Sequence, residues 1–112
     1  MQPRGIHHVS INVHDTAEAV EFYTGVLGMT VRTDRPDFAF AGAWLDVGEH
    51  QVHLLELAVP DNVGQHFAIE VGDLDDAVVR ARQHGAQVSD PSPVGSGRQA
   101  FLRDPSGNTV EL

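Results

Sequence analysis

The sequence contains no cysteine and no lysine, and no apolar run in it approaches membrane-spanning length. The absence of cysteine excludes disulfide bonds and thiolate chemistry and fits a reducing cytoplasm, which is the expected location. Seven arginines stand against sixteen acidic residues, and the net charge of −9 repels phosphate backbones and anionic lipid surfaces. The segment 1–8 also lacks the apolar region of a secretory signal. We therefore expect no nucleic-acid partner and no membrane association, and a small molecule as the ligand.

A chain of 112 residues with 41% hydrophobic residues is long enough for one compact domain with its own core. Within it, the segment 65–73 (QHFAIEVGD) repeats the pattern of the segment 7–15 (HHVSINVHD). At a constant offset His8 matches His66 and Asp15 matches Asp73. Both segments alternate like strands and run into an aspartate that can cap a following helix. The chain is therefore predicted to contain two copies of one unit.

Each copy is predicted to follow the order βαβββ, which gives an α+β fold made of module one (5–59), a linker (60–64) and module two (65–112). In module one a helix is expected to end before Gly28, and it lies among strands at 5–13, 29–33, 38–47 and 51–59. In module two a helix is expected to end before Gly85, among strands at 65–73, 87–89, 98–103 and 109–112. The Pro/Gly/Ser-rich segment 90–97 is the candidate for a mobile lid.

Four side chains recur at equivalent places in this repeat, because His8 and His66 open the two modules and Glu56 and Glu111 close them. The predicted alternation places each of them opposite the aliphatic residues of its strand, so a curved sheet with its helices outside would turn all four into one concavity. Two imidazoles and two carboxylates can hold a divalent Ni, Co, Zn, Mn or Fe ion and leave room for substrate. His53 lies near Glu56, but the same alternation points it toward the helix.

A second group of side chains is predicted to line the cavity beside this metal site. Its members are aromatic residues and one arginine on the same predicted strand faces: Phe38, Phe40, Trp44, Phe101 and Arg103. The aromatic rings would form the apolar wall of a substrate site. The alternative is that these rings pack in the core or in a dimer interface, which is the more frequent role of an aromatic residue on a strand.

Taken together, these residues resemble the vicinal oxygen chelate superfamily, the group of glyoxalase, bleomycin-resistance and type I extradiol dioxygenase proteins. The resemblance covers essentially the whole chain, and its most specific segments are 8–15 (HVSINVHD), 22–23 (FY), 27–28 (LG), 66–69 (HFAI) and 104–108 (DPSGN), followed by Glu111. It implies paired βαβββ modules, an open barrel-like metal cleft and, commonly, a homodimer. Glyoxalase I-like members use His, Glu or Gln, His and Glu, which matches His8, Glu56, His66 and Glu111 by position.

The resemblance implies a lyase or isomerase of glyoxalase type, in which a metal ion binds two neighbouring oxygens of a small substrate and stabilises an enediolate. Glu111 is the preferred base and Glu56 the group that returns the proton, and the repeat makes the two roles interchangeable. Two alternatives stay open. One is an iron-dependent dioxygenase or an antibiotic-modifying thiol transferase, for which His8, His66 and Glu111 suffice. The other is a non-catalytic protein that sequesters a small molecule such as an antibiotic, although that class typically lacks the metal ligands.

Two further expectations concern the substrate and the assembly. Compared with glyoxalase I the chain is shorter and has no clear set of cations for the glutathione carboxylates, for which Arg32, Arg98 and Arg103 are the candidates. The short linker and the habit of the family lead us to expect a homodimer whose subunits share the metal ligands.

Overall fold

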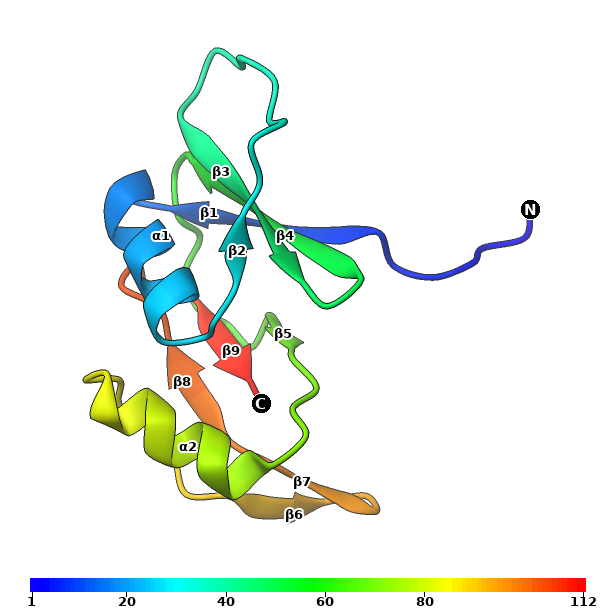
Figure 1. The fold of residues 1–112 in the computed structure, drawn as a ribbon, viewed down its shortest axis with the longest axis vertical. Helices are drawn as coiled ribbons and strands as arrows, with labels where there is room; N and C mark the ends of the chain where they lie inside the picture. Colours follow the sequence, from blue (N-terminus) through cyan, green and yellow to red (C-terminus); the bar gives the residue numbers. More distant parts are fainter.

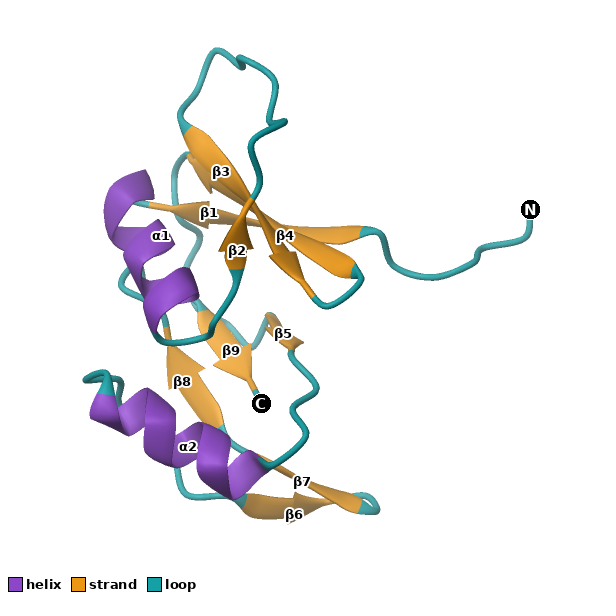
Figure 2. Cartoon of the chain, viewed as in Figure 1, coloured by secondary structure: helices purple, strands orange, loops and turns teal.

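The computed structural model describes residues 1–112 and contains two helices and nine strands. Module one consists of β1 (His8–Val13), α1 (Thr16–Gly25), β2 (Thr30–Val31), β3 (Gly42–Val47) and β4 (His50–Glu56). Module two consists of β5 (His66–Ala68), α2 (Leu74–Gln83), β6 (Ser92–Val94), β7 (Gly97–Gln99), β8 (Phe101–Arg103) and β9 (Thr109–Glu111). Both helices lie on the same side of the molecule, with the strands beside them (Figures 1 and 2). The predicted α+β class is confirmed. Neither helix is long and apolar enough to span a bilayer.

The strand order explains how the two ends of each module come together. The first sheet has the strand order β1-β4-β3-β2, and the second has the order β5-β9-β8. In the second sheet an isolated bridge from Val88 to Leu102 takes the place that β2 has in the first sheet. In both modules the first strand runs parallel to the last, β1 with β4 and β5 with β9. The sheets do not close into a barrel. The first and the last strand of each module therefore lie side by side.

Both helices begin and end where the sequence predicts. Asp15 and Asp73 have extended backbone and accept hydrogen bonds from the amides of Glu18 and Asp76, which satisfies a free donor at each helix start. Beyond the helix ends, Gly28 has φ +70 and Gly85 has φ +89, a region that glycine enters without steric cost.

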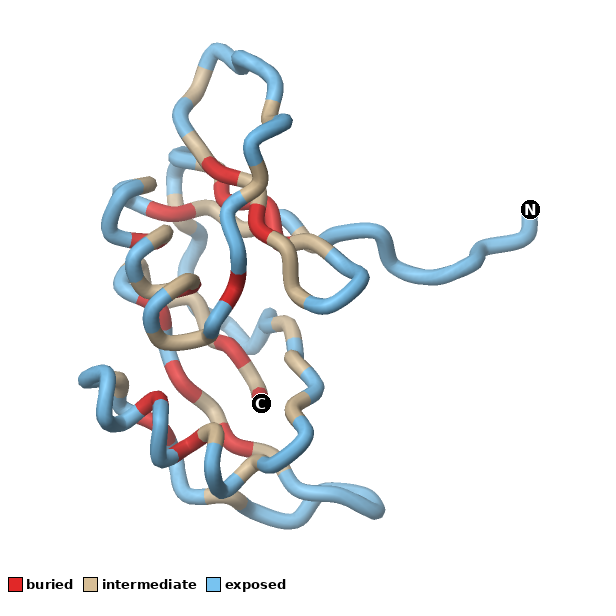
Figure 3. Tube along the Cα trace, in the orientation of Figure 1, coloured by how far each residue is buried: buried red, intermediate tan, exposed pale blue.

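One hydrophobic core runs through both modules and defines an inner face for each sheet. Val52 and Leu54 of β4 are 1% exposed, and Val110 of β9 is fully buried. These residues belong to a single cluster with helix residues such as Tyr23 and Val78. The buried stretches follow the helices and the middles of the strands, whereas the N-terminal segment and the β6–β7 hairpin are exposed (Figure 3). Each sheet therefore packs one face on this core and leaves the opposite face for the candidate site residues.

A buried polar contact ties the two modules to each other. The Tyr23 hydroxyl on α1 donates a hydrogen bond of 2.8 Å to Oδ2 of Asp104, which lies in the turn between β8 and β9. Asp104 also accepts hydrogen bonds from the amides of Ser106 and Asn108 and from the Asn108 side chain. Burial and the neighbouring carboxylate raise the pKa of Tyr23. The turn 104–108 therefore also anchors module two on module one.

Replacing Tyr23 with phenylalanine should destabilise the protein without creating a cavity. The variant removes one donor to the buried Asp104 carboxylate while the other three remain, so we expect a loss of about 1–3 kcal/mol in the free energy of unfolding. Urea unfolding followed by circular dichroism measures it. Phe22→Leu, next to it in the sequence but without a polar contact to Asp104, tests whether the loss comes from the hydroxyl. An unchanged midpoint for Tyr23→Phe would show that this contact contributes nothing.

Several predicted strand limits differ from the structure. The predicted strand 38–47 begins only at Gly42, because β2 pairs with Leu45 and Asp46 and no strand reaches residues 38–40. The predicted strand 51–59 begins at His50 and ends at Glu56. Most of the segment 90–97, the candidate for a mobile lid, belongs to the hairpin β6–β7, which turns at Gly95 with φ +52.

Candidate functional site

Module two brings His66 and Glu111 together on the outer face of its sheet. Because Ala68 of β5 pairs with Glu111 of β9, the imidazole of His66 lies beside the carboxylate, with Nε2 3.0 Å from Oε2. The other ring nitrogen, Nδ1, lies 2.8 Å from the carbonyl oxygen of Gly64, which can only accept, so Nδ1 carries the proton. The Gly64 carbonyl and the Glu111 carboxylate raise the pKa of His66. The repeat predicted this pairing.

The chemistry of this pair fits a divalent metal ion. Two ligand atoms on bonds of about 2.1 Å lie about 3.0–3.4 Å apart around one ion, and His66 Nε2 and Glu111 Oε2 are 3.0 Å apart. A ring whose Nδ1–H is held by a carbonyl keeps its Nε2 lone pair for a cation, as is typical of metal-binding histidines. His66 and Glu111 are therefore fit to form one half of a metal centre.

The corresponding face of module one carries a stack of rings. His8 on β1 stacks on His53 of β4 with ring centroids 4.0 Å apart and an interplanar angle of 13°. On the other side of His53, the Trp44 ring of β3 stacks at 4.3 Å. The His8 and His7 rings touch through their Nδ1 atoms at 2.9 Å. The structure thus places His8 on the outer face, as predicted, beside a second histidine that the sequence analysis turned toward the helix.

The predicted orientation of β4 is wrong. The buried aliphatic residues of this strand are Val52 and Leu54, whereas the predicted helix-facing Leu57 is 44% exposed. Glu56 shares the parity of Leu54, and its Oε1 accepts a hydrogen bond of 2.9 Å from the amide of Thr16, the first residue of α1. A carboxylate at a helix N-terminus is electrostatically favourable. Glu56 is therefore engaged at the start of α1.

The structure does not bring His8 and Glu56 together. His8 pairs with Gln51 across the sheet, and Glu56 lies five residues further along β4, which corresponds to about 16 Å. Within one chain no three His, Asp or Glu side chains lie close enough to hold an ion. His8 and His66 line one cavity of about 760 Å³ between the modules, and Glu111 does not line it. The predicted ligands thus form two separate parts, His66 with Glu111 and His8 with its neighbours.

The predicted substrate-wall residues divide between these two parts. In module one Trp44 belongs to the ring stack, and the Phe38 and Phe40 rings stack at 5.4 Å with the Arg35 guanidinium 4.9 Å from the Phe38 centroid. In module two the centroids of the Phe101 and His66 rings lie 5.8 Å apart with the ring planes nearly perpendicular, and Phe101 pairs with Glu111 across the β8–β9 ladder. Aromatic side chains therefore flank both parts of the candidate site.

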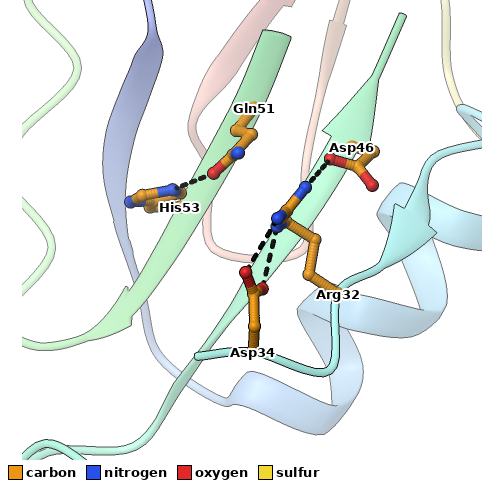
Figure 4. A network of polar contacts seen from close by, with 5 residues as sticks. All are labelled: Arg32, Asp34, Asp46, Gln51 and His53. Carbon is orange, nitrogen blue, oxygen red and sulfur yellow. Dashed lines mark hydrogen bonds and ion pairs between the residues drawn. The ribbon is translucent and has the colours of Figure 1, made fainter. Parts of the chain in front are cut away.

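Of the three predicted arginines, one is free to meet an anionic ligand. Arg32 is held between Asp34 and Asp46, both at 2.8 Å, and these contacts raise its pKa and lower that of Asp34 (Figure 4). Arg98 makes two hydrogen bonds to Asp75. Arg103 makes no ion pair and pairs across the ladder with Thr109, on the strand that also carries Glu111. This pairing places Arg103 on the same face of the sheet as His66 and Glu111.

His53 is the residue that the sequence analysis assigned to the wrong face. Its Nε2 lies 2.8 Å from Oε1 of Gln51 (Figure 4), and the ring is 7% exposed. Burial, together with the neighbouring His8, His7 and arginine charges, lowers the pKa of His53 to about 4, so the ring is neutral at pH 7. The turn before β4 could have predicted the orientation of His53. Only two residues separate Val47 from His50, and Gly48 has φ +56, which fixes the register of the strand.

Comparison with known proteins agrees with this fold over nearly the whole chain. The family model described as glyoxalase/bleomycin resistance protein/dioxygenase superfamily matches residues 5–112. A lactoylglutathione lyase from Arabidopsis thaliana is 34% identical over 94% of this chain, which spans only 42% of that relative. A lactoylglutathione lyase from Salmonella typhimurium is 30% identical, with 94% of this chain and 88% of the relative covered.

A solved structure shows the same fold. TnmS3, an antibiotic binding protein from Streptomyces sp. CB03234, superposes with a TM-score of 0.84 at 24% identity, covering 100% of this chain and 96% of that one. This likeness concerns the fold alone. Together with the family match, it agrees with the paired modules and the open sheets described above. The chain belongs to the glyoxalase/bleomycin resistance protein/dioxygenase superfamily.

Proposed function

We propose that the protein is a metal-dependent enzyme of the glyoxalase type, a lyase or isomerase that moves a proton beside two neighbouring oxygens of a small molecule. The observation that carries the proposal is the 3.0 Å pair of His66 Nε2 and Glu111 Oε2, with the other ring nitrogen anchored on the Gly64 carbonyl. Relatives named lactoylglutathione lyase at 34% and 30% identity support it.

The roles of the residues follow from their positions. A divalent cation held by His66 and Glu111 would act as a Lewis acid toward the two substrate oxygens and lower the cost of the negative charge left by proton loss. The Gly64 carbonyl keeps the His66 ring oriented through Nδ1–H. Glu111 takes the proton at its carboxylate and returns it. The expectation that Glu56 returns the proton stays a prediction, which its hydrogen bond with the Thr16 amide does not support.

The charges on the site face indicate which substrates would fit. Arg103 is the free cation among the three candidate arginines, since Arg32 and Arg98 are bound to aspartates. The Phe101 ring supplies an apolar wall beside His66. We infer a small substrate with adjacent oxygens, an apolar portion and at most one anionic group. Of the three candidate arginines, only Arg103 would be available to a carboxylate of glutathione.

We further propose that the active protein is a homodimer in which module one of one subunit completes the site of module two in its partner. Two observations support this assembly. No three potential ligands meet within one chain. The faces that carry His8 and His66 lie opposite the core, so no helix of the chain covers them. A second copy related by a two-fold axis would supply the missing half to both sites at once.

Metal binding and proton exchange test the proposed function. Protein purified without chelator is titrated with Ni²⁺ by calorimetry, and exchange of the substrate α-proton is followed in D₂O by NMR. The substrates are hemithioacetals of methylglyoxal, one formed with glutathione and one with 2-mercaptoethanol, which carries no carboxylate. We expect metal-dependent exchange with both. Absence of Ni²⁺, Co²⁺ and Zn²⁺ binding would overturn the proposal, and exchange with the glutathione adduct alone would overturn the inferred substrate class.

A second candidate function is non-catalytic binding of a planar small molecule. The stacked Phe38 and Phe40 rings with the Arg35 guanidinium over Phe38 favour it, because such a surface can hold an aromatic ligand. Under this function the protein would bind such a ligand without any metal. A protein that binds no divalent ion but quenches Trp44 fluorescence with planar aromatic compounds would support the second candidate over the first.

A further inference from the structure

Three rings form one continuous stack across the outer face of module one. The His53 ring of β4 lies between His8 of β1, with a centroid distance of 4.0 Å and an interplanar angle of 13°, and Trp44 of β3, with 4.3 Å and 9°. The strand pairing produces this order, because β4 lies between β1 and β3. Since β1 is the edge strand of the sheet, the stack ends at His8, which lines the cavity of about 760 Å³ together with His66.

His53 is held on all sides by its neighbours. Its two faces are covered by His8 and Trp44, its Nε2 lies 2.8 Å from Oε1 of Gln51 (Figure 4), and the residue is 7% exposed. The nitrogen lone pairs of an imidazole lie in the plane of its ring. Because the His8 and His53 rings are nearly parallel, their lone pairs do not converge on one ion. His53 is therefore placed to support its neighbour and not to bind a metal ion with it.

His8, in contrast, is exposed at the cavity and has nitrogen atoms left for a ligand. The stack on His53 touches the face of the His8 ring, whereas a cation is bound at the edge of an imidazole. Nδ1 of His8 lies 2.9 Å from Nδ1 of His7, and Nε2 of His8 makes no hydrogen bond. A side chain that is already ordered before its ligand arrives loses less conformational entropy on binding.

Module two supports its own histidine with the same kinds of contact. The Phe101 ring lies against His66 with a centroid distance of 5.8 Å and an interplanar angle of 81°, and the Gly64 carbonyl oxygen lies 2.8 Å from Nδ1 of His66. In each module an aromatic side chain from a neighbouring part of the sheet thus contacts the ring of the predicted metal ligand. In module one this side chain is His53.

We propose that His53 is a positioning residue, whose ring holds the imidazole of His8 in its orientation for metal binding without contacting the ion. The assignment rests on the proposed function, in which His8 of one subunit completes the centre formed by His66 and Glu111 of the other. What His53 contributes is the flat face of its ring. Another flat ring at this position should therefore serve in its place, although it lacks the nitrogen atoms.

Ni²⁺ affinity, measured by calorimetry on the full chain, tests the assignment with three variants. His53→Ala removes the ring face and should lower the affinity about 10–100-fold, the usual effect of losing a contact that orients a metal ligand. His53→Phe keeps a flat ring between Trp44 and His8 and should bind Ni²⁺ within about threefold of the wild type, whereas a metal ligand at this position would be lost. The control is Val52→Ala, the next residue of β4, which is 1% exposed and packs in the core. It should lower the free energy of unfolding but leave the Ni²⁺ affinity unchanged.

The Co²⁺ absorption spectrum gives a second readout, because loss of a nitrogen ligand changes its visible bands, and circular dichroism shows which variants are folded. We expect His53→Phe to keep the wild-type Co²⁺ bands. A folded His53→Phe that no longer binds Ni²⁺ overturns the assignment, because a nitrogen atom of His53 would then be required.

Two further outcomes would also contradict this role of His53 and leave the proposed function intact. One is wild-type affinity in a folded His53→Ala. The other is an equal loss of affinity in Val52→Ala, which would show that any destabilisation of β4 weakens binding. If His53→Ala does not fold, His53→Leu, which fills the space without a flat face, takes its place with the same expected loss. A wild-type protein that binds no Ni²⁺, Co²⁺ or Zn²⁺ overturns the proposed function and this assignment together.

Discussion

Replacing Glu111 with glutamine is expected to slow the exchange of the substrate α-proton by about 10²–10⁴-fold, the usual contribution of a general base. The amide cannot take the proton, but its oxygen can still face a cation beside His66, from whose Nε2 the native Oε2 is 3.0 Å away. Ni²⁺ binding should therefore weaken much less than turnover. NMR in D₂O measures the exchange at saturating Ni²⁺, so that the loss of rate is separated from the loss of metal.

The matched control for this experiment is Glu70→Gln. Glu70 is an exposed carboxylate two residues beyond the end of β5, and it lines the cavity that also contains His66. The same chemical change there should leave exchange within about twofold, because Glu70 is exposed and makes no hydrogen bond or ion pair with His66 or Glu111. Full exchange in Glu111→Gln would show that another group is the base. Loss of exchange in Glu70→Gln would move that role to the neighbouring strand end.

Local signals in the sequence were sufficient to predict the helices and the half of the candidate site that contains His66 and Glu111. The aspartate caps at 15 and 73 and the glycines at 28 and 85 act within one helical turn, so no tertiary information is needed to find them. His66 and Glu111 lie on strands with one clear apolar phase, which runs through Phe67 on β5 and Val110 on β9. Their predicted shared face depends on that phase, and the structure places the two side chains in contact.

Strand β4 shows why the other half of the site was not predictable in the same way. The run Val52-His53-Leu54-Leu55-Glu56-Leu57 offers two apolar phases, one through Val52 and Leu54 and the other through Leu55 and Leu57. The hydrophobic pattern alone cannot choose between them. The choice is made by the tight turn at Gly48 and by the pairing with β3, in which Val47 meets His50. A three-residue turn, as the sequence suggested, shifts the register by one and reverses the faces.

Mixing two variants that each fail to bind metal is expected to restore about a quarter of the wild-type Ni²⁺ capacity. One variant carries His8→Ala in module one and the other carries His66→Ala in module two. If module one of each subunit completes module two of its partner, a mixed dimer holds one site with both changes and one site with neither. Random exchange makes about half of the dimers mixed, and each has one intact site of two.

The experiment requires refolding the two variants together, desalting after Ni²⁺ loading and measuring bound nickel per chain. The matched control mixes His66→Ala with Glu111→Ala, which both lie in module two. Every site of that mixed dimer lacks a module-two ligand, so no capacity should return. Light scattering establishes the mass of each mixture. If the first mixture is dimeric but regains no Ni²⁺ capacity, all ligands of one site belong to one chain. The two parts of the site, which are separate in the structure, would then have to move together within that chain. A monomer that binds Ni²⁺ as tightly as the wild type would remove the need for a second copy.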